Sequence, residues 1–150
     1  MRYNIFTETI LKRLTMGCDI HVFAEKKDDK GNWKSIPRFS VFQDRNYTVF
    51  SFLAGVRKYD EIQAISPPRG IPKDVSSTAQ NSFKRLGMDA HTPSWLSLEE
   101  LMAFNYDKKV YAKNDPRQGT YRDFLEHYFF SDLEKMKEKG VERIVFWFDN

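Results

Sequence analysis

The chain has 150 residues, a mass of 17.8 kDa and a formal net charge of +3. This length favours a single domain, and a hydrophobic fraction of 41% with 30% charged residues argues against a fibrous or disordered chain. A single cysteine excludes an intrachain disulfide framework and fits a reducing cytosol. No stretch approaches the roughly 20 apolar residues that cross a bilayer, so no membrane partner is predicted.

The positive charge is concentrated at the N-terminus. Residues 1–15 hold three basic side chains and one acidic one, so the rest of the chain is close to neutral. A nucleic-acid-binding protein usually has a concentrated basic face, so extended nucleic acid is not favoured as a partner, while a small phosphorylated ligand stays open. Residues 1–15 lack the apolar core of a signal peptide. They are either an extra helix or the product of an upstream start codon, and we prefer the second; residues 16–150 are the predicted single domain.

Residues 17–26 alternate in hydropathy, which predicts a β-strand. Residues 27–32 are polar and contain a glycine, and residues 33–36 read as a returning strand. The pattern therefore predicts a hairpin. The two faces of its first strand consist of Cys18, Ile20, Val22 and Ala24 on one side and Asp19, His21, Phe23 and Glu25 on the other.

The segment after residue 43 is predicted to begin a helix. Asp44 is a suitable N-cap for it, and apolar side chains between Val49 and Val56 recur at helical spacing. Residues 58–76 then contain three prolines and a glycine, which prevent regular structure over a long stretch. Long irregular loops are uncommon in compact domains and are often functional.

Three further helices and a final strand complete the predicted elements. A helix over 77–86 is closed by a glycine, and a capping box at 97–100 starts a short helix. Residues 120–123 begin the longest helix in a similar way, which ends near Gly140. Residues 141–148 are apolar on both faces, as in an interior strand, and are expected to pair with the first strand. The predicted fold is therefore α+β, a small mainly antiparallel sheet (N-terminal hairpin plus C-terminal strand) packed against several helices.

Two Asp-x-His pairs are the main candidates for chemistry. Asp19 and His21 are on one strand face, about 6.6 Å apart at the backbone, so their side-chain tips can converge. Asp89 and His91 repeat this spacing in a segment that reads as a loop. Together they predict either a divalent metal site with these four side chains as ligands, or metal-free acid–base catalysis in which His21 and His91 act with Asp19. The competing interpretation is an ordinary half-exposed strand, on which Asp19 orients His21.

The proline-rich loop and the segment near residue 95 are candidates for ligand binding. Arg69 can donate a planar pair of hydrogen bonds to a phosphate or carboxylate. Asp74 either caps the next helix or holds Arg69, and the alternative is a rigid surface turn with a structural Arg–Asp pair. Trp95, with Ser94 beside it, can stack on a planar ligand, although most tryptophans belong to a core.

A second ligand-binding group is expected at the start of the helix after residue 43. Arg45 and Tyr47 can reach an anion there, where backbone N–H groups also favour negative charge. Two other reactive residues are predicted to be structural. Cys18 is on the strand face opposite His21, which favours a buried, inert thiol over a nucleophile. His127 lies among aromatic residues in the longest helix and is predicted to be a packing or surface residue.

Six short motifs are distinctive in combination: Met16-Gly17-Cys18-Asp19-Ile20-His21, Asp44-Arg45-Asn46-Tyr47, Leu53-Ala54-Gly55-Val56-Arg57, Pro68-Arg69-Gly70-Ile71-Pro72, His91-Thr92-Pro93-Ser94-Trp95-Leu96-Ser97-Leu98 and Val145-Phe146-Trp147-Phe148-Asp149-Asn150. They resemble a family of small bacteriophage and prophage proteins of uncharacterised function. The resemblance implies a protein that begins at Met16, a phage or its host as the source, and the cytoplasm of the bacterial host cell as the setting. It transfers no activity, ligand or catalytic residue. By analogy, small phage proteins often counter host defence by destroying or sequestering nucleotide signals.

Two functions from different classes follow from these observations. The leading hypothesis is a small phage-type hydrolase that acts on a phosphorylated or nucleotide-like small molecule, with a divalent metal ion or without one, and counteracts host defence. The alternative is a non-catalytic phage protein that sequesters a nucleotide signal or a host protein. A purely structural phage component is a third interpretation, in which the two histidines of the Asp-x-His pairs have no functional role.

Overall fold

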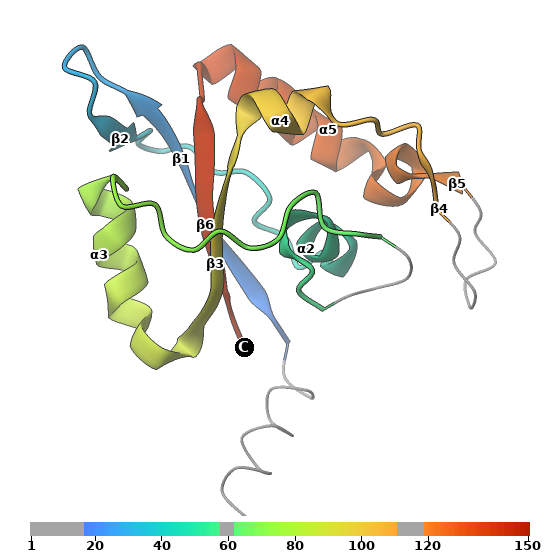
Figure 1. The fold of residues 1–150 in the computed structure, drawn as a ribbon, viewed down its shortest axis with the longest axis horizontal. Helices are drawn as coiled ribbons and strands as arrows, with labels where there is room; N and C mark the ends of the chain where they lie inside the picture. Colours follow the sequence, from blue (N-terminus) through green and yellow to red (C-terminus); the bar gives the residue numbers. More distant parts are fainter. Residues whose placement is uncertain (1–16, 58–61, 111–118) are drawn as a thin grey trace, which may run out of the picture.

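The structure is a computed structural model that describes residues 17–57, 62–110 and 119–150, so the predicted extension over residues 1–15 lies outside the described residues. Its sheet has four strands in the order β2–β1–β6–β3, and a second small sheet pairs β4 with β5 (Figure 1). All pairings are antiparallel, which confirms the predicted α+β fold. In chain order the elements are β1 (Asp19–Lys27), β2 (Trp33–Ser35), α2 (Tyr47–Ala54), α3 (Ser77–Leu86), the 3₁₀ turn η1 (Gly87–Asp89), β3 (Ala90–Ser97), α4 (Leu98–Ala103), β4 (Lys109–Val110), β5 (Gly119–Thr120), α5 (Tyr121–Lys139) and β6 (Arg143–Asp149).

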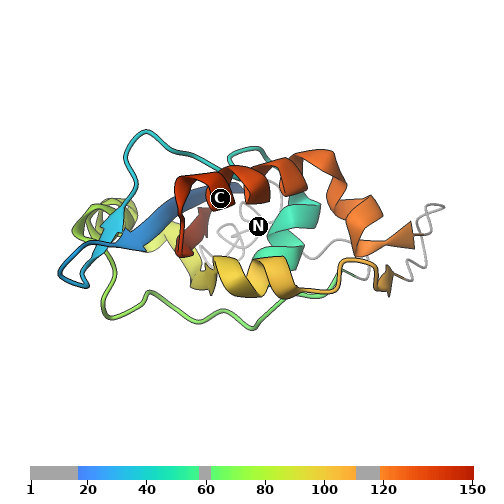
Figure 2. The same ribbon diagram turned by 90° about the horizontal axis from the view of Figure 1, so that it is seen from above.

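Helices cover the sheet on both faces. α3 lies against one face, and α2, α4 and α5 lie on the other side (Figures 1 and 2). β6 is an interior strand because it pairs with β1 on one side and β3 on the other, and six of its seven residues are buried. The prediction of an interior C-terminal strand that pairs with the first strand is therefore confirmed.

Aromatic side chains fill much of the core between the sheet and α2, α4 and α5. The ring of Phe52 in α2 meets four other aromatic rings, those of Phe104, Tyr106, Tyr121 and Phe129. Such ring pairs contribute about 0.5–1.5 kcal/mol each beyond the burial of their area. On the opposite face a smaller layer forms, in which the buried ring of Trp147 contacts Phe23 and the α3 residue Phe83.

The hairpin forms as predicted, but the first helix begins later than expected. β1 and β2 pair around the turn at residues 28–32. α2 starts at Tyr47, and its N-cap is Asn46, whose side-chain oxygen accepts a hydrogen bond from the N–H of Val49 at 3.2 Å. The prediction that Asp44 caps this helix is therefore wrong, because a capping side chain stands only two or three residues before the N–H group that it accepts.

The other helix boundaries follow their capping signals. α4 and α5 both begin with complete capping boxes, at Ser97 with Glu100 and at Thr120 with Asp123, as predicted. α5 is interrupted at Glu126, whose φ of 64° and ψ of 174° are not helical, although the apolar pattern predicts one continuous helix. None of the helices in the described ranges has the length and hydropathy required to cross a bilayer.

β3 is the main difference between the expected and observed elements. The segment around His91, predicted to be a loop, is an edge strand that pairs with β6. Its pairing shifts register between His91 and Ser94, and Thr92 has a φ of 51°. Pro93 is tolerated because an edge strand or a bulge does not require every backbone N–H to be bonded. Because the proline and the bulge interrupt the alternation of polar and apolar residues, the sequence pattern does not predict this strand.

A buried ion pair ties β1 to β6 at the end of the sheet where β2 joins it. Glu25 is fully buried, and its carboxylate accepts hydrogen bonds from Arg143 Nε at 2.7 Å and from the N–H of Ser76 at 2.9 Å. The Arg143 guanidinium also bonds Asp74 at 3.0 Å and lies over the Trp33 ring. Every polar group of this cluster has a partner, so it joins three elements without an unpaired charge.

Candidate functional site

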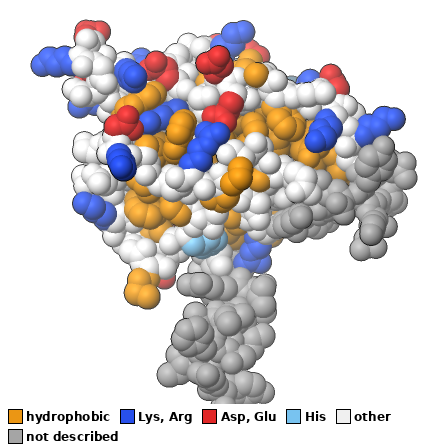
Figure 3. Space-filling view, viewed as in Figure 1, with side chains coloured by type: hydrophobic (Ala, Val, Ile, Leu, Met, Phe, Trp, Pro, Cys, Tyr) orange, Lys and Arg blue, Asp and Glu red, His pale blue; other side chains and the backbone are white. Residues whose placement is uncertain are grey.

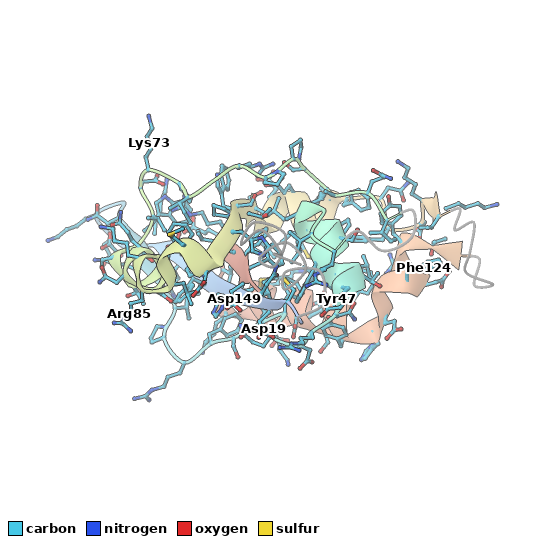
Figure 4. The ribbon with its side chains drawn as sticks, turned by 90° about the horizontal axis from the view of Figure 1, so that it is seen from below. Asp19, Tyr47, Lys73, Arg85, Phe124 and Asp149 are labelled. Atoms are coloured by element: carbon cyan, nitrogen blue, oxygen red, sulfur yellow. The ribbon has the colours of Figure 1, made fainter. Side chains whose placement is uncertain are left out.

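Polar side chains from distant parts of the sequence meet at one end of the main sheet. This end is formed by the start of β1, the end of β6 and the start of β3, and its residues Asp19 and Asp149 are 130 positions apart in the chain. Asp19 pairs in register with Asp149, which in turn pairs with Ala90 of β3. Seen from below, Asp19, Tyr47 and Asp149 lie close together near the middle of this end (Figure 4). Figure 3 shows one histidine side chain and one Lys or Arg side chain at the surface toward the lower edge of the described residues. We call this region the strand-end site.

His21 is held by a carboxylate within the strand-end site. Its Nε2 is hydrogen-bonded to Asp149 Oδ2, and its ring is stacked on Trp147 at 6.1 Å between centroids. The His21 side chain is 35% exposed, so one side of the imidazole faces solvent. A carboxylate that accepts one ring N–H fixes both the tautomer and the orientation of a histidine. The other ring nitrogen, Nδ1, then carries the lone pair.

Asp19 is joined to Arg45 by two parallel hydrogen bonds. Arg45 Nε donates to Asp19 Oδ1 at 2.6 Å, and Nη2 donates to Oδ2 at 3.1 Å. These hydrogen bonds and the guanidinium charge hold the pKa of Asp19 below its ordinary value. Gly17 leaves the space that the guanidinium occupies, because a Cβ at this position would lie 2.1 Å from Arg45 Nη1.

The second predicted pair, Asp89 with His91, does not join His21 in one cluster. His91 is opposite Phe148 and stacks on it, whereas His21 is opposite Trp147 and stacks on that ring. Consecutive residues of a strand face opposite sides of the sheet, so the two imidazoles lie at one end of the sheet but on opposite faces.

The hydrogen bonds of His91 also belong to its own face. Its Nε2 lies 3.1 Å from Asn150 Oδ1 and its Nδ1 3.0 Å from Thr92 Oγ1. The remaining predicted ligand, Asp89, is exposed on η1. Across the three described ranges, no group of three or more His, Cys, Asp or Glu side chains is arranged to hold a metal ion.

Cys18 and Tyr47 connect the strand-end site to α2. The N–H of Cys18 donates to the Tyr47 hydroxyl at 3.2 Å, and the Arg57 guanidinium lies over the Tyr47 ring at 5.6 Å. The Cys18 side chain is fully buried, and burial raises the pKa of its thiol despite the nearby Arg57 charge. A thiol with a raised pKa is a poor nucleophile, which agrees with the structural role predicted for it.

Arg69, Ser94 and Trp95 form a separate group on β3 and its neighbouring loop. The Arg69 guanidinium donates two hydrogen bonds to Glu100, at 2.5 and 2.8 Å, and lies over the Trp95 ring at 4.7 Å. The Ser94 hydroxyl accepts the N–H of Arg69 at 3.0 Å. The hydrogen-bonding groups of these side chains are paired with one another, and they hold the proline-rich loop against the sheet edge. Arg69, Ser94 and Trp95 are therefore not part of the strand-end site.

Asp74 occupies neither of the positions predicted for it. Ser76 is the N-cap of α3, since its hydroxyl accepts the N–H of Ala79. The Asp74 carboxylate instead accepts hydrogen bonds from Arg143 Nη1 and from Trp33 Nε1, both at 3.0 Å. The prediction that Asp74 caps α3 or holds Arg69 is therefore wrong, because a buried arginine distant in sequence recruits it.

Sequence analysis missed two residues of this strand end, Asp149 and Asn150. Both follow the last buried residues of β6, and each contacts one histidine. The signal that could have found them is the polar pair that ends an apolar strand predicted to lie beside β1.

The indole N–H of Trp147 is fully buried without a hydrogen-bond partner in the described structure. A buried donor of this kind costs about 1–3 kcal/mol unless water or a ligand accepts from it.

His127, predicted to be a packing or surface residue, is exposed on α5, outside the strand-end site. It borders a cavity of about 310 Å³ between α5 and residues 40–44, together with Tyr128 and Asp132. A second cavity, of about 390 Å³, lies beside the outer edge of β1. Neither cavity is lined by His21, His91 or Asp149.

Comparison with known proteins identifies no relative: no protein-family model, no curated protein and no solved structure matches the chain.

Proposed function

We propose that the strand-end site hydrolyses a small phosphorylated or nucleotide-like molecule, with His21 as the general base and acid. The observation that carries the proposal is the pairing of a partly exposed imidazole with Asp149, beside a second carboxylate that is itself held by Arg45. A histidine whose second nitrogen is fixed by a carboxylate is a recurring arrangement for proton transfer.

The proposed step uses the free nitrogen of His21. While Asp149 accepts a hydrogen bond from Nε2–H, Nδ1 takes a proton from a water molecule, and the water oxygen attacks the phosphorus atom. The bond from phosphorus to the leaving oxygen then breaks, and the imidazolium returns its proton to that oxygen. Asp149 stabilises the imidazolium between the two proton transfers. The products are an alcohol and a phosphate, so atoms and charges balance without a further reactant.

Arg45 is the group that would bind the anionic part of the substrate. A guanidinium carries five N–H donors. Two of them are used by Asp19, which leaves three for phosphate oxygens, and the side chain is 56% exposed. Asp19 acts as a positioning residue in this proposal because it holds Arg45 and does not itself transfer a proton. A nucleotide signal is the substrate class we propose to test first, by analogy with small phage proteins that counter host defence.

The test is incubation of the protein with a panel of nucleotides and simple phosphomonoesters, followed by denaturation and chromatographic identification of the released molecules. Wild-type protein, His21→Gln and His127→Gln are compared, with His127 as the matched control because it is an exposed histidine on α5. We expect new products from the wild type and His127→Gln, and none from His21→Gln. Each arm is run with and without a chelator, and the chelator is expected to leave turnover unchanged.

Other results lead to the alternative functions. A ligand that is retained and released intact would indicate sequestration without turnover. Turnover that survives in His21→Gln would remove His21 from the chemistry. Loss of turnover with the chelator would instead favour the predicted metal-dependent variant.

A further inference from the structure

Arg57, a second arginine beside the strand-end site, reaches it from the far end of α2. It follows this helix in the chain, yet its guanidinium lies over the ring of Tyr47, the first residue of the same helix, at 5.6 Å. The Arg57 side chain therefore runs back along α2 toward the start of the helix. Tyr47 accepts the N–H of Cys18 and lies close to Asp19 and Asp149 (Figure 4).

The buried thiol of Cys18 shows which charges surround this point. Burial is the main cause of its raised pKa; the charge of Arg57 lowers that pKa, whereas the charges of Asp149 and Asp19 raise it further. Charges act on a titrating group in this way only at short range, so all three side chains lie near one sulfur atom. Since Arg45 is bonded to Asp19, two guanidinium groups belong to the strand-end site.

The position of Arg57 is energetically unfavourable in two respects. Its φ of 50° is in the left-handed region, which costs an arginine energy that a glycine or an asparagine largely avoids. Its charge also lies at the N-terminal, positive end of α2, where cations are disfavoured, and the first turn of this helix contains no acidic residue. An anion bound between these positive charges would reverse the second effect.

Arg45 and Arg57 approach the start of β1 from opposite sides. Arg45 is bonded to Asp19, whose side chain is 47% exposed, whereas Arg57 lies near Cys18, which belongs to the buried core. Consecutive residues of a strand face opposite sides, so the chain itself separates the two cations. The two phosphates of a diphosphate share one bridging oxygen and lie side by side. Phosphates on two different hydroxyls of one molecule match this separation better.

We propose that the substrate of the strand-end site carries two phosphate groups on different hydroxyls, one held by Arg45 and the other by Arg57. This inference rests on the proposed function. The phosphate beside Arg45 and His21 is hydrolysed to an alcohol and a phosphate, and the second phosphate stays on the product. Binding of a group that does not react can position the group that does. Arg57 is then the residue that selects bisphosphates over monophosphates.

The test is calorimetric binding of three nucleotides to the intact protein. They are adenosine 3′,5′-bisphosphate and the two monophosphates that remain when either phosphate is removed. Binding is measured with the wild type and with His21→Gln, in which the proposed chemical step is blocked. We expect the bisphosphate to bind at least about tenfold more tightly than either monophosphate in both proteins, because it gains charge-assisted hydrogen bonds to a second guanidinium.

Arg57→Asn assigns this preference to Arg57. Asparagine suits the left-handed backbone, so this variant is expected to fold at least as well as the wild type. It is expected to bring the bisphosphate within about twofold of the tighter monophosphate, whereas Arg85→Asn, at an exposed position on α3, keeps the preference. Equal affinities in the wild type, a preference that survives Arg57→Asn, or no binding of the bisphosphate at about 1 mM would overturn the proposal.

Binding and turnover together separate this inference from the proposed function. A bisphosphate preference that depends on Arg57, without any release of phosphate, would refute the hydrolysis and keep the two-phosphate site. Hydrolysis of the monophosphates as fast as that of the bisphosphate, unchanged in Arg57→Asn, would keep the hydrolysis and refute the second phosphate position.

Discussion

Replacing Arg143 with methionine removes the cation that faces the buried carboxylate of Glu25. Arg143 itself is 5% exposed and Glu25 is 0% exposed, and they are joined at 2.7 Å. Methionine retains only the inner, apolar part of the side chain and loses the guanidinium that lies over the Trp33 ring, and it leaves the Glu25 carboxylate with the Ser76 N–H as its remaining hydrogen-bond partner. Breaking a buried pair by removing one partner typically costs about 3–5 kcal/mol.

The size of this loss can be set against the stability of the whole domain. Single domains unfold with about 5–15 kcal/mol, so Arg143→Met is expected to remove a large share of the total. The second ion pair of Arg143 adds little, because the Asp74 side chain is 66% exposed and exposed pairs contribute about 0–1 kcal/mol. The double variant Glu25→Met with Arg143→Met is expected to recover part of the loss, since no buried charge then remains.

Urea unfolding followed by tryptophan fluorescence measures these differences. Arg122→Met is the matched control, because Arg122 pairs with Asp107 at 3.3 Å but both side chains are more than half exposed. We expect the control to cost less than about 1 kcal/mol. If Arg143→Met cost no more than Arg122→Met, the buried pair would not be what holds this end of the sheet.

Two smaller predictions concern the first helix and the strand-end site. Asn46→Ala is expected to lower the free energy of unfolding by about 1 kcal/mol because Asn46 is the N-cap of α2, and Asp44→Ala is expected to lower it by much less. Equal urea unfolding midpoints for the two variants would contradict this prediction. Gly17→Ala is expected to displace the Arg45 guanidinium and raise the pKa of Asp19 toward its ordinary value. Because Asp19 has a lowered pKa in the folded state, its contribution to stability is present above about pH 4 and is lost as the pH falls through that pKa. A carboxyl NMR titration that finds the same Asp19 pKa in both proteins would refute the assignment.

The fold follows from local signals wherever those signals are undisturbed. The alternation in residues 17–26, the apolar final strand and the capping boxes at Ser97 and Thr120 predict the elements that the structure contains. β3 escapes prediction because Pro93 and the bulge before Ser94 break its alternation, and its place is fixed by pairing with β6. The cap of α2 is missed because Asp44 and Asn46, two residues apart, are both residue types that favour the N-cap position.

The site is less accessible to sequence reasoning than the fold. Asp19 and His21 are correctly placed on one strand face, opposite to the buried Cys18. The partner of His21, however, is Asp149, 128 positions away, and finding it requires the register of β1 against β6. Pairing between these strands is predictable, but a shift of one residue would send every side chain to the other face. The same register decides that His91 faces away from His21.

The central claim is that Asp149 and His21 act together in proton transfer. Its most direct test is a single-turnover measurement on the phosphoester identified by the panel, comparing wild type, Asp149→Asn and His127→Gln, with substrate affinity and the rate of the chemical step determined separately. We predict that Asp149→Asn retains substrate affinity but slows the chemical step by about 100-fold or more, while His127→Gln matches the wild type. A chemical step that proceeds at the wild-type rate in Asp149→Asn would contradict the account.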